Sequence, residues 1–215
     1  MSIATRKKVA SRKKPSQKRS QATVKSILTA TRGLLVKQGL NTLTTNHIAN
    51  GADISVGSLY QYFPNKQAII SELYTAWLSE VRNEMESFIG HAVSGDTSNE
   101  DLMFTFFQLI YDGWKDGSDD LKFVREMHAA TRLFPDLIGL DQAHGLLMAD
   151  ILAKIMKVMG SEKDDEELKK IGLYLYGIHN AFENIIVSHQ GDMEAMLILH
   201  EQSLQLFINN MLENP

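Results

Sequence analysis

Residues 42–66 read Thr-Leu-Thr-Thr-Asn-His-Ile-Ala-Asn-Gly-Ala-Asp-Ile-Ser-Val-Gly-Ser-Leu-Tyr-Gln-Tyr-Phe-Pro-Asn-Lys, and this stretch decides the fold. It predicts two short helices, because Thr44 and Ser55 each occupy an N-cap position between the apolar residues of a hydrophobic staple. The Gly-Ala-Asp sequence at 51–53 supplies turn residues that tolerate a left-handed backbone. Helices this short are unstable alone, so the protein must need them held at a fixed angle. A helix-turn-helix, which lays its second helix in the DNA major groove, meets that need.

The charge distribution agrees with contact to an anion at one end of the chain. Residues 1–52 contain eleven of the 22 Lys and Arg residues and no acidic residue, whereas residues 53–215 contain eleven basic and 26 acidic residues. The net charge of −4 therefore divides into +11 and −15. Such asymmetry is typical of proteins that contact nucleic acid or an anionic surface with one end. A merely solvated tail is the alternative, but beside a helix-turn-helix we favour neutralisation of phosphates.

Composition excludes several other classes of protein. With 215 residues and 44% hydrophobic residues, the chain has enough apolar material for a substantial core. No apolar run reaches the roughly 18 residues of a membrane span, and the N-terminus lacks the apolar segment of a secretory signal. The basic, acid-poor N-terminus also has the composition of a transit peptide. We favour that alternative less, because the segment contains Pro15 and leads directly into a helical pattern. The chain has no cysteine, which excludes disulfides and thiolate chemistry. We expect a cytoplasmic protein without a membrane partner.

Helical periodicity predicts an all-α protein in three parts. Residues 1–19 are expected to form a flexible basic arm, residues 20–66 a three-helix DNA-binding domain, and residues 67–215 a helical bundle for ligand binding and dimerisation. Gly39 is expected to end the first helix in a left-handed conformation, and Gly90 to end the fourth. No alternating strand pattern is present. The expected helices span 20–38, 45–52, 56–62, 66–89, 99–115, 119–133, 137–159, 165–189 and 192–212.

Residues 20–75 resemble the DNA-binding domain of the TetR family of bacterial transcriptional regulators. The matching residues are Ile27-Leu28, Gly39, Leu43-Thr44-Thr45, Ile48-Ala49, Ser55-Val56-Gly57-Ser58-Leu59-Tyr60-Gln61-Tyr62-Phe63 and Asn65-Lys66. The resemblance fixes the spacing of these residues over about forty positions, and covers the rest of the chain only by helical pattern. Asp53 and Thr31 depart from it, since the family usually has Gly and a small Ala there. The resemblance implies a homodimer, a DNA partner and, for most of the family, a repressor.

Position in the two short helices assigns the expected DNA contacts. Residues at the start and outer face of the second helix are expected to reach base edges; they are Ser55, Val56, Gly57, Ser58 and Gln61. The resemblance implies a further base contact from Asn46, at the start of the preceding helix. Hydroxyls and an ammonium near the helix termini suit phosphates; these are Thr44, Thr45, Tyr60, Tyr62 and Lys66. Leu59 and Phe63 are expected in the core. Tyr60 is equally well explained by packing, and His47 better as a surface residue than as a base reader.

The last two helices carry a signal for dimerisation, because each is apolar on more than one face and therefore needs two partners. The interface is expected along one heptad-like stripe of each helix. Its members are Leu168, Ile171, Leu175, Ile178, Phe182, Leu197, Leu204, Phe207 and Met211. An edge of a monomeric core is the alternative. A two-fold dimer would bind a roughly palindromic operator.

Aromatic and sulfur-containing residues, with a few polar ones, are typical of a pocket for a small hydrophobic or aromatic effector. The candidates are Trp77, Phe107, Tyr111, Trp114, Phe123, Met127, His128, Arg132, Met148 and Asn180. Ordinary core packing explains each of them as well. A ligand would release DNA only through different affinities for two conformers.

No catalytic, metal-binding or cofactor-binding motif is present. Asp141 and His144, like His189 and Asp192, are spaced three apart, but neither pair has a third ligand at a useful spacing. No phosphate loop or nucleophile elbow occurs. We therefore favour a DNA-binding regulator without a cofactor. A helical-bundle enzyme or a membrane-surface protein with a basic arm is the alternative.

Overall fold

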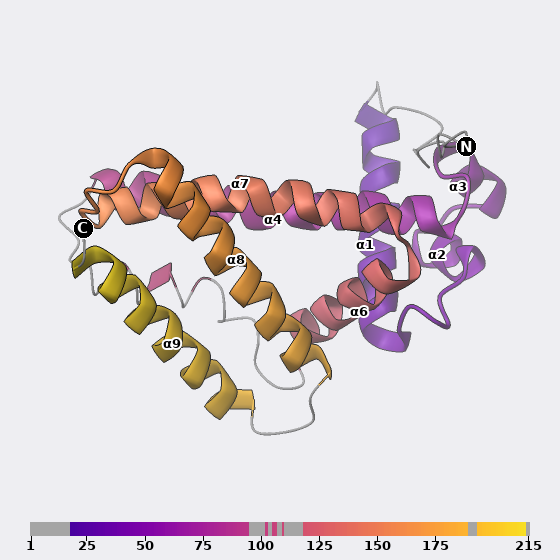
Figure 1. The fold of residues 1–215 in the computed structure, drawn as a ribbon. Coiled ribbons are helices and arrows are strands. Elements are labelled where there is room, and N and C mark those ends of the chain that lie inside the picture. The colour runs from indigo at the N-terminus through magenta and orange to yellow at the C-terminus, as the bar shows by residue number, and fades with distance from the viewer. Residues whose placement is uncertain are drawn as a thin grey trace, which may run out of the picture. The chain divides into compact units, whose positions relative to one another are not determined.

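A computed structural model describes residues 18–94, 118–188 and 193–213, together with Leu102, Thr105, Phe106 and Leu109. Residues 1–17 of the expected basic arm and the side chains of Phe107, Tyr111 and Trp114 lie outside the described residues. Lys18 and Arg19, also expected in that arm, are instead the first residues of a helix. All regular structure in the described part of the chain is helical (Figure 1). None of its helices is long and apolar enough to span a bilayer. The all-α prediction is confirmed.

The chain divides into two compact units that are each built from two segments. Unit 1 takes Met1–Trp77 and Lys122–Leu140, and unit 2 takes Leu78–Leu121 and Asp141–Pro215. This division differs from the expected boundary after residue 66, because the beginning of the fourth helix and a later segment join the N-terminal helices. Helix bounds are α1 Lys18–Gln38, α2 Thr45–Gly51, α3 Val56–Tyr62, α4 Lys66–Ser94, α6 Asp119–Leu133, α7 Asp136–Val158, α8 Asp165–Ser188 and α9 Met193–Glu213.

Unit 1 has a core of buried apolar side chains around the two short helices. Apolar side chains from all its helices are almost fully buried; they include Ile27, Leu35, Ile48, Leu59, Phe63, Ile69, Ile70, Phe123, Met127 and Leu137. Thr31, one of the two departures from the family pattern, is also buried, and its hydroxyl donates to the carbonyl of Ile27 at 2.7 Å. This bond satisfies the hydroxyl within α1, so the substitution leaves no unmet donor.

Unit 2 has its own core, formed where α7 and α8 pack with parts of α4 and α9. The buried cluster comprises Met85, Phe106, Met148, Ile151, Leu152, Ala153, Ile155, Met156, Met159, Leu168, Leu175, Leu204 and Ile208. Gly172 lies against α7 so closely that a Cβ atom there would collide with the carbonyl of Ala149. Gly145 similarly lies under the ring of Tyr176, whose Cε1 would be 2.5 Å from a Cβ at that position. Small residues thus allow α7 and α8 a close approach.

Most helix boundaries match the prediction, and one does not. Gly39 and Gly160 end α1 and α7 with φ of 77° and 94°, as expected for C′ glycines. Gly90 does not end α4, which continues to Ser94. A single glycine costs a helix interior only about 1 kcal/mol, so it weakens α4 without ending it.

Candidate nucleic-acid interface

Helices α2 and α3 begin with the side-chain caps that the sequence predicts. The Thr44 hydroxyl accepts the backbone N–H of His47 at 3.2 Å, and the Ser55 hydroxyl accepts that of Ser58 at 3.1 Å. Both cap residues have the extended backbone required at this position, with ψ of 158° and 151°. Each helix has only seven residues, and its cap satisfies one of the four amides that a helix N-terminus leaves unpaired.

The turn between the two helices is tight and left-handed at one residue. Asp53 has a φ of 54°, the one positive φ among the described non-glycine residues. The amide of Asp53 donates to the carbonyl of Asn50 at 3.2 Å, and that of Ile54 to the carbonyl of Ala49 at 3.0 Å. A Cβ at Gly51 would lie 3.3 Å from the Cβ of Ala30, so α2 packs closely on α1. The angle between α2 and α3 is therefore fixed by backbone bonds and by packing.

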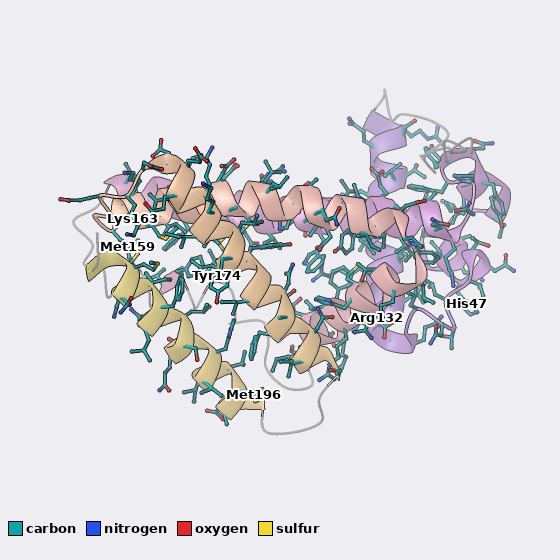
Figure 2. All side chains as sticks on the ribbon, in the orientation of Figure 1. His47, Arg132, Met159, Lys163, Tyr174 and Met196 are labelled. Carbon is teal, nitrogen blue, oxygen red and sulfur yellow. The ribbon has the colours of Figure 1, made fainter. Side chains whose placement is uncertain are left out.

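The outer face of this pair carries the residues predicted to contact DNA. Ile48, Ala49 and Leu59 are buried beneath it. Exposed positions are Thr44, Asn46, His47, Ser55, Gly57, Tyr60 and Gln61, whereas Thr45, Val56, Ser58, Tyr62 and Lys66 are half-buried. Figure 2 labels His47, which projects from α2. Within unit 1, small residues such as Gly57 and Ser58 at the beginning of α3 would let DNA come close to the helix backbone. A helix that reads base edges in the major groove requires such a close approach.

Two side-chain pairs connect the expected contact residues to one another. The hydroxyls of Thr45 and Tyr60 are 3.2 Å apart and join α2 to α3. The hydroxyls of Ser55 and Ser58 are 2.9 Å apart within the cap of α3. Hydrogen bonds of this kind hold side chains in one orientation before a ligand arrives, which lowers the entropy cost of binding.

Comparison with known proteins agrees with this geometry. Residues 27–73 match the profile described as bacterial regulatory proteins, tetR family. Residues 27–73 are therefore similar to the DNA-binding domain of the TetR family. The chain is also 26% identical over 77 residues to the HTH-type transcriptional repressor KstR2 of Rhodococcus jostii. That match covers 36% of this chain and 38% of the relative, so it spans little more than a third of either protein.

Solved structures extend the likeness in fold beyond the matched domain. A TetR-family protein from Mesorhizobium loti is 16% identical, with a TM-score of 0.69, and the match covers 90% of this chain and 98% of that one. Thermus thermophilus FadR, a TetR-family repressor solved in complex with lauroyl-CoA, is 21% identical with a TM-score of 0.59, covering 88% and 95%. At these identities the comparison shows a shared fold over both units.

Lys66 does not have the surroundings expected for a phosphate contact. Its Nζ atom donates to the carbonyls of Leu40 and Leu43 at 3.2 and 3.0 Å. An ammonium has three N–H donors, so two of them are used inside the protein. The carboxylate of Glu126, which the sequence analysis did not single out, accepts the N–H of Leu40 at 2.6 Å. No local pattern could have indicated Glu126, because it lies 86 residues from its partner.

The expected effector residues do not gather in one unit. Phe123 and Met127 are core residues of unit 1, and the guanidinium of Arg32 lies 4.0 Å above the Phe123 ring. The ring of Trp77 meets that of Phe123 edge-on at 5.8 Å. His128 and the exposed Arg132 (Figure 2) also belong to unit 1. Met148 and Asn180 belong to unit 2. Phe123 and Met127 are therefore core residues of unit 1, and the effector pocket stays a prediction.

The predicted dimer stripe faces the core of its own subunit. Leu168, Leu175, Phe182 and Leu204 are each at most 7% exposed, so a second copy could not reach them; this part of the prediction is wrong. Ile171, Ile178 and Phe207 are partly buried and pack against the same core, while Leu197 and Met211 are half-buried. Several apolar residues off that stripe are exposed instead: Leu173, Tyr174, Ile198, Leu199 and Leu206. Ile185, which continues the stripe three residues after Phe182, is exposed as well. Heptad spacing identified two-faced helices but could not tell the inner face from the outer.

Unit 2 also buries polar groups that the sequence did not reveal as a cluster. His144, Glu183 and His200 come from three helices and are at most 8% exposed. The hydroxyl of Tyr176 lies 3.4 Å from the carboxylate of Asp141, and His179 Nε2 lies 3.3 Å from Glu183 Oε1. Among the described residues, no three His, Asp or Glu side chains are placed to hold a metal ion.

Burial controls the titration of these groups. Desolvation lowers the pKa of His144, although the nearby Asp141 carboxylate opposes the shift. Desolvation lowers the pKa of His200 to about 4, and its ring stacks on Phe182 with centroids 3.9 Å apart. Desolvation also raises the pKa of Tyr176 above its ordinary value. Both histidines are therefore neutral at pH 7, which suits their apolar surroundings.

Proposed function

We propose that this protein is a DNA-binding transcriptional repressor that acts as a homodimer on a roughly palindromic operator. The observation that carries the proposal is the rigid, outward-facing pair α2–α3, capped at Thr44 and Ser55 and braced from below by Ile48 and Leu59. Such a pair presents base-reading side chains at the beginning of its second helix. KstR2 and FadR are both named repressors, which favours repression over activation. The alternative of an enzyme or a membrane-surface protein has no comparable observation.

We infer that the base readers are Asn46, Ser55, Val56, Gly57, Ser58 and Gln61. Gln61 is exposed on α3 and carries the amide that pairs with adenine. Thr44, Thr45, Tyr60 and Tyr62 then contact phosphates. Gln61→Ala should change which bases are preferred, whereas Thr44→Ser should leave both the cap and the preference intact.

The dimer proposal now rests on the outer apolar faces of α8 and α9. Leu199 and Leu206 are 59% and 71% exposed and lie seven residues apart on one face of α9. Exposed apolar side chains that share one face are typical of an interaction surface, whereas singly scattered ones are not. Tyr174, labelled in Figure 2, extends this surface on α8 and packs on Phe207 with centroids 5.4 Å apart. Leu206→Glu should yield monomers by light scattering, while Leu206→Met, which keeps this surface apolar, should leave the dimer intact.

The decisive experiment is selection of bound sequences from a random duplex pool by the full chain. We expect a two-fold symmetric consensus whose half-sites are about 10 base pairs apart, or a multiple of that spacing, because two recognition helices must enter the same face of the duplex. Enrichment of no sequence, or of a single asymmetric half-site, would contradict the proposal. Release of that operator by lauroyl-CoA, the ligand of FadR, is the first test of a small apolar effector.

A further inference from the structure

The segment 39–43 connects α1 to α2 and fixes where α2 begins. Gly39 turns the chain with a φ of 77°, and its amide donates to the carbonyl of Leu35 at 2.9 Å. Leu40 and Leu43 are each 2% exposed, so the segment is anchored in the core of unit 1. The cap residue Thr44 follows immediately. Any displacement of this segment therefore displaces the first turn of α2.

Two oppositely charged side chains hold the backbone of this segment. Lys66, the first residue of α4, donates from Nζ to the carbonyls of Leu40 and Leu43. Glu126, on α6, accepts the amide of Leu40 at 2.6 Å. Its Oε1 atom would lie 3.3 Å from a Cβ at Gly39, which shows how closely the carboxylate packs on the turn. Hydrogen bonds to charged groups are shorter and stronger than neutral ones.

We propose that Lys66 and Glu126 are positioning residues for DNA recognition. They act through the segment 39–43, and Lys66 does so in place of the phosphate contact that its sequence position suggests. The inference rests on the proposed function, because it concerns how α2 and α3 are aligned for the operator. Without either side chain, the backbone of the segment would lose hydrogen bonds that fix its position, although Leu40 and Leu43 would still hold it in the core, and α2 would carry α3 away from its best alignment.

This role differs from a phosphate contact in two measurable ways. Loss of a phosphate contact weakens binding to every duplex alike and reduces the salt dependence by about one unit per contact. Loss of a positioning residue weakens the operator selectively and leaves the salt dependence unchanged. For Glu126 the two explanations even differ in sign, because removing an anion from a DNA-binding unit favours DNA by simple electrostatics.

The variants are Lys66→Met and Glu126→Leu, with Lys66→Arg and Glu126→Gln as conservative partners that retain a donor or an acceptor. Lys37→Met and Glu72→Leu are matched controls, since both residues are exposed in unit 1 and lose the same charges. Affinity is measured on the selected operator and on a random duplex of equal length over a range of salt concentrations. Amide exchange at Leu40 and thermal unfolding are measured without DNA.

We expect Lys66→Met and Glu126→Leu each to weaken operator binding by about tenfold, the scale of one charged hydrogen bond. The salt slope and the affinity for random duplex should stay those of the wild type. The conservative variants should recover most of the loss, and exchange at Leu40 should accelerate in Glu126→Leu. Lys37→Met should weaken both duplexes to a similar degree.

Two results of the binding measurements would overturn the inference, and one of the exchange measurement would do so independently. One is an equal loss of Lys66→Met on both duplexes with a reduced salt slope, which would assign Lys66 to a phosphate. The other is tighter operator binding by Glu126→Leu, as expected for Glu72→Leu. If the wild type selects no duplex, the proposed function fails, whereas unaltered Leu40 exchange in Glu126→Leu would refute the positioning role independently. Should Lys66→Met not fold, Glu126→Gln against Glu126→Leu gives the same decision.

Discussion

The sequence determines the α2–α3 pair of unit 1 through short-range bonds, whereas it determines the α8–α9 pair of unit 2 through contacts between helices. In the first pair, each cap joins residues three positions apart, such as Ser55 and Ser58. In the second, the stacked rings of Phe182 and His200 come from different helices. Short-range bonds are visible in a sequence because spacing alone defines them. Contacts between helices are not, because spacing shows only that a face is apolar.

The two units also differ in what they bury. The buried histidines and the buried carboxylate of the described residues, His144, His200 and Glu183, all lie in unit 2. Unit 1 buries Thr31, whose hydroxyl is satisfied within its own helix. The stability of unit 2 should therefore depend on close helix packing and on pH. That of unit 1 should depend mainly on local caps and turns.

Gly172→Ala tests the packing of unit 2 most severely. A Cβ at this position collides with the backbone carbonyl of Ala149, and a backbone atom cannot move aside as a side chain can. We expect the free energy of unfolding to fall by about 3 kcal/mol, the upper range for overpacking. Denaturant unfolding followed by circular dichroism measures the change.

Gly177→Ala is the matched control for that substitution. It lies on the same helix, where a Cβ meets no atom within 4 Å. Alanine should raise stability there by up to about 1 kcal/mol through helix propensity. Equal effects of the two substitutions would mean that α7 and α8 do not approach closely at Gly172.

Acidification should destabilise unit 2 through His200. Its pKa is about 4 when folded, against 6.5 as the ordinary value. The unfolded chain therefore binds a proton first as the pH falls below 6.5, and the folded state loses stability between pH 6.5 and 4. At pH 5 the loss is about 2 kcal/mol. His144 adds to it in the same direction, because its pKa is also lowered.

The measurement is the free energy of unfolding from pH 8 to pH 4.5 for the wild type and for His200→Gln. Glutamine does not titrate, so the variant should be less stable at pH 8 yet lose less on acidification. Parallel curves for the two proteins would show that His200 titrates normally in the folded state.

The sequence predicted what local chemistry determines. Val56–Tyr62 was expected as a helix with these bounds, and Gly39 and Asp53 take the positive φ that their positions suggested. Side chains that act across the fold escaped prediction. The ammonium and the position of Lys66 suggested a phosphate contact, yet Lys66 donates to backbone carbonyls that folding brings near.

The dimer surface illustrates the same limit. Leu175 and Leu173 lie two residues apart on α8 and are 4% and 46% exposed. Both belong to apolar stripes, and nothing in their spacing ranks one stripe above the other. The choice depends on which face α7 and α9 cover, and that is decided by contacts far apart in the sequence.

Ser55→Ala tests how much the N-cap of α3 contributes to the stability of unit 1. The hydroxyl of Ser55 satisfies the amide of Ser58, and losing an N-cap costs about 1 kcal/mol. Ser55→Asn retains a capping oxygen and should recover most of that stability. Thermal unfolding of both variants decides the matter, and an equal loss for alanine and asparagine would mean that the cap contributes little.

Asp53→Asn should have the smallest effect on stability. The left-handed φ of 54° suits asparagine as well as aspartate, so we expect a change within about 0.5 kcal/mol. Asp53→Ala should cost about 1 kcal/mol, because alanine has no side chain to compensate the left-handed conformation. The carboxylate lies in the turn of the DNA-binding pair, so its loss should also tighten binding to any duplex about twofold at low salt, and less at high salt. Unfolding and duplex titration at two salt concentrations separate the effects. Asp53→Asn could instead lose as much stability as Asp53→Ala. That result would show that the negative charge of Asp53 stabilises this turn, and not its tolerance of a left-handed backbone.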